Sequence, residues 1–241
     1  MKVLGIESSA GIASVAITDN GRILSEFTTD SGNTHSATLL PMIESSLKVV
    51  GMNISDIDLF ALSAGPGSFT GLRIGAATVK GLALAGNAPC VGVSSLEAMA
   101  ENLRGLPGVV CPVINARSAR VYTALFETDG KGVPKRLTED DVLTLDELSP
   151  LIERFDGAPV YFTGDAYDLA REKTDAPDTP LTLRRQNAVG VALLGERKYR
   201  MATGAEREAM TGEALSVIYL RKPQAERERE ARLAAKEGEN E

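Results

Sequence analysis

The sequence predicts an α/β protein made of two related halves, and two observations support this fold class. Short apolar runs typical of buried strands alternate along the chain with segments of helical periodicity. Each half also begins in the same way, with an apolar strand, a small polar turn and a second strand. A Gly/Pro-rich cluster at residues 105–108 separates the two halves. We therefore expect an N-terminal subdomain at residues 1–106 and a C-terminal subdomain at 107–223, followed by a charged tail at 224–241.

The first half opens with strands and then a helix. The strands are expected at residues 2–7, 12–18 and 22–28, with Asn20-Gly21 as a two-residue hairpin signal between the last two. A helix is expected from about residue 36 to 50, because Leu40, Ile43, Leu47 and Val50 repeat at helical spacing. Pro41 lies early in this segment, so the helix either begins after it or kinks there.

The stretch from residue 59 to 86 is the centre of the first half. A short strand at 59–62 leads into the glycine loop Gly65-Pro66-Gly67-Ser68. Ser68 or Thr70 can cap the next helix, which is expected to run to about Ala85 with Gly86 as its C-terminal glycine. This helix is apolar or small over most of its circumference, which is typical of a helix buried on more than one side. It is either a central core helix or a helix that also contacts a partner.

The remaining elements follow the same alternation. A strand at 89–93 precedes a helix at 96–103 that opens with the capping-box pattern S-x-x-E at Ser94. The second half has expected strands at 109–114, 120–127 and 160–162, and expected helices at about 144–155, 166–174 and 187–203. A last short apolar segment lies at 217–220. The tail is almost entirely Ala, Arg, Lys and Glu, which predicts a frayed, solvated helix or a disordered segment.

Two loops have the composition of a phosphate site. Glu7-Ser8-Ser9 lies in the first hairpin turn, and an acid followed by hydroxyls can hold a metal-bound phosphate or form an ordinary turn. The glycine loop joins a strand to a helix N-terminus, an arrangement that exposes backbone N–H groups to an anion. Its spacing, G-x-G-x-x-x-G, matches neither the dinucleotide fingerprint nor a P-loop. Asp165, which follows the strand at 160–162, is a third candidate for this site.

Composition restricts the classes of function. The formal net charge of −7 argues against tight nucleic-acid binding by this chain alone, because non-specific affinity comes from Lys and Arg on phosphates. The single histidine, His35, and two isolated cysteines exclude the common zinc arrangements. Cys90 and Cys111 lie in apolar surroundings and are expected to be reduced and buried. No apolar run is long enough to span a membrane, so we expect a cytoplasmic protein.

Several motifs together resemble one family. The segments GPGSFTGLRIG at residues 65–75 and GVSSLEA at 92–98 are specific to it, and LGIESS at 4–9, NAR at 115–117 and YLR at 219–221 are shared more widely. The chain resembles the TsaB (YeaZ) family, the accessory proteins of bacterial tRNA threonylcarbamoyladenosine biosynthesis, which are related to the TsaD transferases and to M22-type glycoproteases. The resemblance spans about residues 2–221. It implies an actin/Hsp70/sugar-kinase-like fold of two related subdomains with mixed central sheets.

The resemblance also implies a role without catalysis or cofactor. Family members pair with a TsaD-type subunit, which forms N6-threonylcarbamoyladenosine at position 37 of tRNAs reading codons that begin with A. A TsaE-type ATPase joins the complex, tRNA is contacted only through it, and the free chain is expected to form a homodimer. Pairing through the two helices near 36–50 and 70–85 implies the following interface: His35, Leu39, Leu40, Ile43, Leu47, Arg73, Ile74, Ala77, Lys80 and Leu84. The loops described above then form a vestigial nucleotide or phosphate site: Glu7, Ser8, Ser9, Gly65, Gly67, Ser68 and Asp165.

Two departures from the wider family weigh against other functions. The catalytic relatives carry two histidines on the early helix, whereas this chain has only His35 and no metal site of that kind. Asn115 stands where the family usually has Asp, which removes a Mg²⁺ ligand. A metallopeptidase is therefore not supported. A nucleotide-dependent ATPase or phosphotransferase of the same fold stays as the alternative, built on Glu7, Ser8, Gly67 and Asp165.

Overall fold

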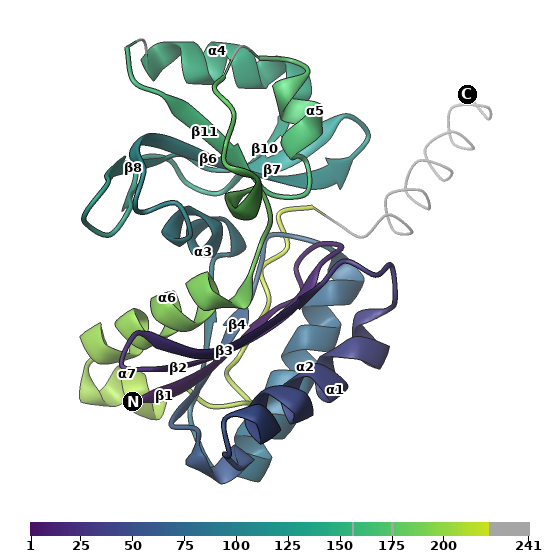
Figure 1. Cartoon of the computed structure of the whole chain (residues 1–241), viewed down its shortest axis with the longest axis vertical. Helices are drawn as coiled ribbons and strands as arrows, with labels where there is room; N and C mark the ends of the chain where they lie inside the picture. Colours follow the sequence, from purple (N-terminus) through teal and green to yellow (C-terminus); the bar gives the residue numbers. More distant parts are fainter. Residues whose placement is uncertain (156, 175, 222–241) are drawn as a thin grey trace, which may run out of the picture.

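Two mixed β-sheets, one above the other in Figure 1, form the framework of the protein. The computed structural model describes residues 1–155, 157–174 and 176–221. The first sheet has the strand order β3-β2-β1-β4-β5. Its strands are β1 (Lys2–Glu7), β2 (Ala13–Asp19), β3 (Arg22–Thr29), β4 (Leu59–Ser63) and β5 (Cys90–Val93). The hairpin β1–β2–β3 is antiparallel and β1, β4 and β5 are parallel, so the first sheet is mixed as predicted.

Helices cover both faces of this first sheet. On one face lie α1 (His35–Val49) and α2 (Phe69–Gly86), side by side, and on the other lies α6 (Ala188–Met201) with α7 (Gly204–Glu208) (Figure 1). Because covered parallel strands are buried on both sides, β4 is buried along its whole length and is apolar up to its last residue, Ser63. Although α6 comes from the C-terminal half of the sequence, it packs on β1 and β4. The subdomain boundaries at 106/107 and 223/224 stay predictions.

The second sheet is organised by one long strand, β6 (Pro107–Arg117). The strand order is β10-β7-β6-β8-β9, and β11 also pairs with β6. The other strands are β7 (Arg120–Thr123), β8 (Phe126–Asp129), β9 (Lys135–Arg136), β10 (Asp141–Thr144) and β11 (Val160–Thr163). The second hairpin, β6–β7, was predicted, whereas β9 and β10 were not.

One predicted strand, at residues 120–127, is wrong. The chain breaks at Ala124 and Leu125, both buried, and the two pieces pair with different parts of β6. The first piece, β7, pairs with residues 113–117, and the second, β8, pairs with residues 107–110. The run, RVYTALFE, is apolar at most of its inner positions and contains no Gly, Pro or Asn to mark the break, so its pattern is that of one continuous strand.

Short helices and 3₁₀ turns complete the fold. The first half adds α3 (Ser95–Glu101) and the turn η1 (Ile54–Asp56). The second half adds α4 (Leu148–Ile152) and α5 (Tyr167–Arg171), with the turns η2 (Leu145–Glu147), η3 (Glu153–Phe155) and η4 (Leu181–Leu183). A capping box is present at Thr144, because Glu147 Oε2 accepts from the Thr144 N–H at 2.7 Å. Ser94 caps α3 by accepting from the Glu97 N–H at 3.3 Å, as predicted.

The ends of α1 and α2 show how local sequence sets the helix limits. Ser68 caps α2, and its hydroxyl accepts from the Gly71 N–H at 3.4 Å. The predicted C-terminal glycine is wrong: Gly86 is still helical, and Asn87 takes the left-handed conformation with φ 49°. Asparagine tolerates that conformation better than most residues, so it can end a helix in place of glycine. In the other helix, α1 begins at His35 and continues through Pro41.

Buried apolar side chains form clusters in both halves. The largest lies between the first sheet and the pair α1 and α2, and another lies between the same sheet and α6. Two further clusters fill the second half. The predicted tail at 224–241 lies outside the described residues. None of the helices within the described ranges is long and apolar enough to cross a membrane.

Candidate functional site

The glycine loop lies directly on the turn of the first hairpin. The Ser68 N–H donates to the Ser9 carbonyl at 2.6 Å, and the Ser8 hydroxyl donates to the Gly71 carbonyl at 3.0 Å. Ser8 and Ser9 are fully buried. A Cβ on Gly67 would collide with the Ser9 carbonyl, so this glycine is needed for close approach. The hairpin turn therefore packs directly against the glycine loop.

Glu7, at the end of β1, is buried below this contact. Its Oε1 accepts from the N–H and the hydroxyl of Ser9, at 2.6 Å and 2.5 Å. Its Oε2 is buried without a hydrogen-bond partner among the described residues. Burial raises the pKa of the Glu7 carboxyl, the hydrogen bonds from Ser9 lower it, and the nearby charge of Asp165 raises it further. The charge of Asp165, from the second half, thus acts on Glu7, whereas the predicted phosphate site stays a prediction.

Asp165 follows β11, in the second half. Its Oδ1 accepts from the Asn115 N–H at 2.9 Å. Burial raises the pKa of this carboxyl, whereas that hydrogen bond and the charges of Arg185 and Arg117 lower it. The side chain of Asn115 is turned to its own loop, where its Oδ1 accepts from the Arg117 N–H at 2.8 Å. In the part of the chain that the structure describes, no three His, Cys, Asp or Glu side chains are grouped to hold a metal ion.

The single histidine connects α1 to the first hairpin. His35 Nε2 lies 2.7 Å from the Ala10 carbonyl, to which it donates. Its Nδ1 is buried with no partner among the described residues. The imidazole therefore anchors the start of α1 on the hairpin turn, a contact that the sequence did not predict.

The predicted interface residues on α1 and α2 divide into an inward and an outward set. Leu39 and Ile43 are 1% and 3% exposed and belong to the core cluster, so their side chains are not accessible to a partner in this fold. Leu47 and Ile74 are half-buried and pack against the same cluster. His35 and Lys80 are also half-buried. The outward set is Leu40, Arg73, Ala77 and Leu84.

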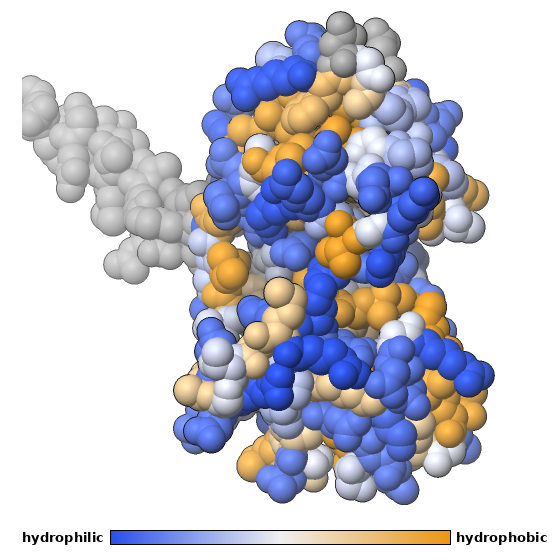
Figure 2. Space-filling view, turned by 90° about the vertical axis from the view of Figure 1, so that its left-hand side faces the viewer, coloured by the Kyte–Doolittle hydropathy of each residue, from blue (hydrophilic) through white to orange (hydrophobic). Residues whose placement is uncertain are grey.

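Two leucines of the outward set are largely exposed to solvent. Leu40 on α1 is 56% exposed and Leu84 on α2 is 86% exposed, and the two helices pack side by side. We call the outward side of this pair the α1/α2 face. On the opposite side of the molecule, over α6 and α7, hydrophobic and hydrophilic residues are interspersed (Figure 2). Large apolar side chains exposed on neighbouring helices are typical of an interaction surface.

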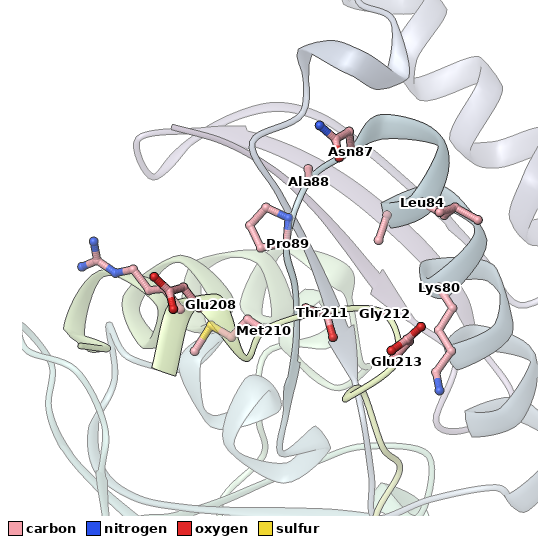
Figure 3. Close-up of a pocket in the computed structure, with 12 residues that line it drawn as sticks. Lys80, Leu84, Asn87, Ala88, Pro89, Glu208, Met210, Thr211, Gly212 and Glu213 are labelled. Atoms are coloured by element: carbon pink, nitrogen blue, oxygen red, sulfur yellow. The ribbon is translucent and has the colours of Figure 1, made fainter. Parts of the chain in front are cut away.

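A groove continues the α1/α2 face at the end of α2. It measures about 760 Å³ and lies between the second half of α2 and residues 207–213 (Figure 3). Lys80 and Leu84 contribute from the helix, and Met210 and Glu213 from the later segment. Two predicted interface residues thus line a concave surface that sequence reasoning did not find.

Sequence reasoning also missed a contact at the start of α2. Tyr219 lies over Phe69, with ring centroids 4.9 Å apart, and its hydroxyl accepts from Arg73 Nε at 3.0 Å. The only signal in the sequence was a tyrosine in the short apolar segment at 217–220.

Comparisons with known proteins agree on one family. The family model described as TsaD, tRNA N6-adenosine threonylcarbamoyltransferase, matches residues 23–226. The chain is 31% identical over 228 residues to a Bacillus subtilis protein named tRNA threonylcarbamoyladenosine biosynthesis protein TsaB. This alignment covers 94% of the chain and 96% of that protein.

Solved structures agree on the fold. YeaZ from Pseudomonas aeruginosa superposes with a TM-score of 0.74 at 26% identity, covering 90% of this chain and 99% of that one. Component A of (R)-2-hydroxyglutaryl-CoA dehydratase from Acidaminococcus fermentans superposes with a TM-score of 0.50 at 14% identity, covering 83% and 99%. The fold is therefore the predicted actin/Hsp70/sugar-kinase-like fold.

Proposed function

We propose a function from one premise, that the chain belongs to the TsaB family, which is related to the tRNA N6-adenosine threonylcarbamoyltransferase TsaD. Its role lies in the formation of threonylcarbamoyladenosine in tRNA. Within that process it is a non-catalytic subunit that binds a TsaD-type transferase and activates it. The modified base is adenosine 37 of tRNAs that read codons beginning with A.

The observation that carries this proposal is the exposure of Leu40 and Leu84 on two adjacent helices of the α1/α2 face. A free chain gains nothing from these side chains in water, whereas a partner that covers them gains the free energy of burying apolar surface. Arg73 and Ala77 share the α2 side of the face, so a charged residue and a small one accompany the leucines. Small side chains allow another helix to approach closely.

The arrangement around the glycine loop supports a role without catalysis. Phosphoryl transfer needs a phosphate cradle, and here the Ser68 N–H that would contribute to one already donates to Ser9. Burial raises the pKa of the Glu7 carboxyl, which disfavours the charged form that would position Mg²⁺. The seven residues of the predicted phosphate site are therefore proposed as vestigial, with no cofactor.

The remaining partners follow from the same role. A TsaE-type ATPase joins the complex, and tRNA is contacted through the complex rather than by the acidic chain alone. Without its transferase partner the chain forms a homodimer through the α1/α2 face, which keeps the exposed leucines out of water.

Reconstitution tests the activating role. Threonylcarbamoyl-adenylate, tRNA, ATP and the TsaD-type and TsaE-type subunits are combined with and without this chain, and modified adenosine is measured by mass spectrometry of digested tRNA. We expect product only when the chain is present, and equal product with the Glu7→Gln variant, because Glu7 serves no catalytic step. Product formation without the chain contradicts activation. A complex that forms with Glu7→Gln but makes no product favours the phosphotransferase alternative.

A further inference from the structure

The last described segment, residues 215–221, crosses from the first half of the molecule to the second. We call it the C-terminal strap. Just before it, the Cys90 N–H donates to the Met210 carbonyl at 2.9 Å, so the chain arrives along the edge strand β5. Leu215 is buried in the core cluster of the first half. The Ile218 N–H then donates to the Ala64 carbonyl at 2.7 Å, which places the strap beside the glycine loop.

The glycine loop is shaped to receive the strap. A Cβ on Gly65 would collide with the Ile218 carbonyl, and Gly65 has a φ of +118° that favours glycine. Since Ser68 also donates to Ser9, the loop is held between the first hairpin on one side and the strap on the other. The glycine pattern that suggests a phosphate site in the sequence therefore serves packing within the chain.

Three consecutive residues of the strap reach three different parts of the structure. Tyr219 stacks on Phe69 and accepts from Arg73, and the Arg73 guanidinium lies 3.9 Å from the centre of the Phe69 ring. Leu220 packs against the core cluster of the second half. Arg221 donates to the carbonyls of Ala116 and Arg117 in the second hairpin.

The hairpin turn that Arg221 holds is strained. Arg117, Ser118 and Ala119 all have positive φ angles, of 65°, 55° and 54°, which is costly for residues other than glycine. Such a turn persists only when its surroundings hold it, and the Arg221 guanidinium supplies part of that support. The YLR motif thus connects the first turn of α2 to a strained turn of the second half.

We propose that the C-terminal strap positions α2 for its partner, with Tyr219 and Arg221 as positioning residues. Arg73, which Tyr219 holds, lies four residues before Ala77 and eleven before Leu84, so all three follow one side of α2. The strap therefore fixes the N-terminal end of the α1/α2 face relative to the second half. This inference rests on the proposed function only for the identity of the partner.

Hydrogen–deuterium exchange of the free full-length chain tests the first step. The Tyr219→Ala and Arg221→Gln variants should each exchange about tenfold faster at residues 65–72. Tyr219→Ala removes the contacts with Phe69 and Arg73, and Arg221→Gln releases the end of the strap from the second hairpin, which loosens Ile218 beside Gly65. The control is Arg207→Gln, since Arg207 also donates to two main-chain carbonyls but outside the strap, and its exchange at 65–72 should not change. Wild-type exchange at 65–72 in both strap variants overturns the proposal. If these variants also lose protection in β1 and β4, the fold as a whole is loosened, and the milder Tyr219→Phe variant is measured instead. Its exchange at residues 65–72 should be about threefold faster than that of the wild type, and unchanged exchange there would contradict the proposal.

Calorimetric titration with the TsaD-type subunit tests the second step. Tyr219→Ala should weaken binding about tenfold, whereas Tyr219→Phe, which keeps the ring stack, should stay within about threefold. Leu181→Ala is the control, because Leu181 is 77% exposed on the second half, away from the strap. A wild-type chain that does not bind overturns the proposed function. Wild-type binding with equal affinity for all variants overturns the strap's positioning role alone.

Discussion

The two exposed leucines of the α1/α2 face allow partner binding to be separated from folding. Fully burying a leucine side chain stabilises by about 1.5–3 kcal/mol. Leu40 is 56% exposed and Leu84 is 86% exposed in the free chain, so a partner that covers both gains about 2–4 kcal/mol from them. The double variant Leu40→Ala/Leu84→Ala should therefore raise the Kd for the TsaD-type subunit roughly 30- to 1,000-fold.

The same exposure predicts a small effect on the fold. Each substitution should change the free energy of unfolding by less than about 1 kcal/mol, because most of each side chain is already in water. Ile43→Ala provides the contrast: Ile43 is 3% exposed, and its truncation should cost about 2–5 kcal/mol. Leu181→Ala, at 77% exposed on η4, is the matched surface control and should change neither quantity.

Urea denaturation and calorimetric titration with the TsaD-type subunit measure the two effects. Unchanged affinity in the double variant, with a folded chain, would refute the assignment of these leucines to the interface. A loss of stability as large as that of Ile43→Ala would show that the leucines serve the fold instead.

Three further outcomes are expected. Burial raises the pKa of Glu7 in the folded state, so its contribution to stability is present at low pH and is lost as pH rises through that pKa. Glu7→Gln should therefore have a higher Tm than wild type at pH 8, with a difference that shrinks toward pH 4; equal Tm curves would contradict this. A Cβ on Gly71 would collide with the first hairpin, so Gly71→Ala should destabilise by about 1–3 kcal/mol, whereas Gly81→Ala, with open space around it, should stabilise by about 0.5–1 kcal/mol in urea denaturation. Cys90 and Cys111 are buried free thiols, and burial raises the pKa of Cys111 to about 12, so a thiol reagent at pH 8 should label neither until the chain unfolds.

Local signals in the sequence account for most of the elements. The Asn20-Gly21 turn, the apolar run of β4 and the serine caps of α2 and α3 act within a few residues, so reading them required no knowledge of the fold. Two predictions from local sequence were wrong. Asn87 rather than Gly86 ends α2, and the run at 120–127 breaks into two strands without a turn residue. The placement of α6 on the first sheet depends on long-range packing that periodicity does not record.

The least accurate part of the predicted interface was which apolar residues of α1 are buried and which are exposed. Leu39, Leu40 and Ile43 are all apolar and close in sequence, yet the first and last are in the core and Leu40 is exposed. Which of these side chains is buried depends on how α1 is rotated about its axis against the sheet, and the apolar stripe in the sequence does not determine that rotation. Glu7 and Asp165 could be assigned to one candidate site because each lies at the end of a predicted strand, whereas the influence of Asp165 on Glu7 across the two halves depends on long-range packing.

The most direct measurement is size-exclusion chromatography with light scattering of this chain, alone and mixed with the TsaD-type subunit of its own organism. The account predicts that a 1:1 complex replaces the free species, and that the Leu40→Ala/Leu84→Ala variant elutes separately from the transferase at the same micromolar concentrations. Separate elution of the wild-type chain and the transferase, with and without ATP, would contradict the central claim that this protein acts by binding its catalytic relative.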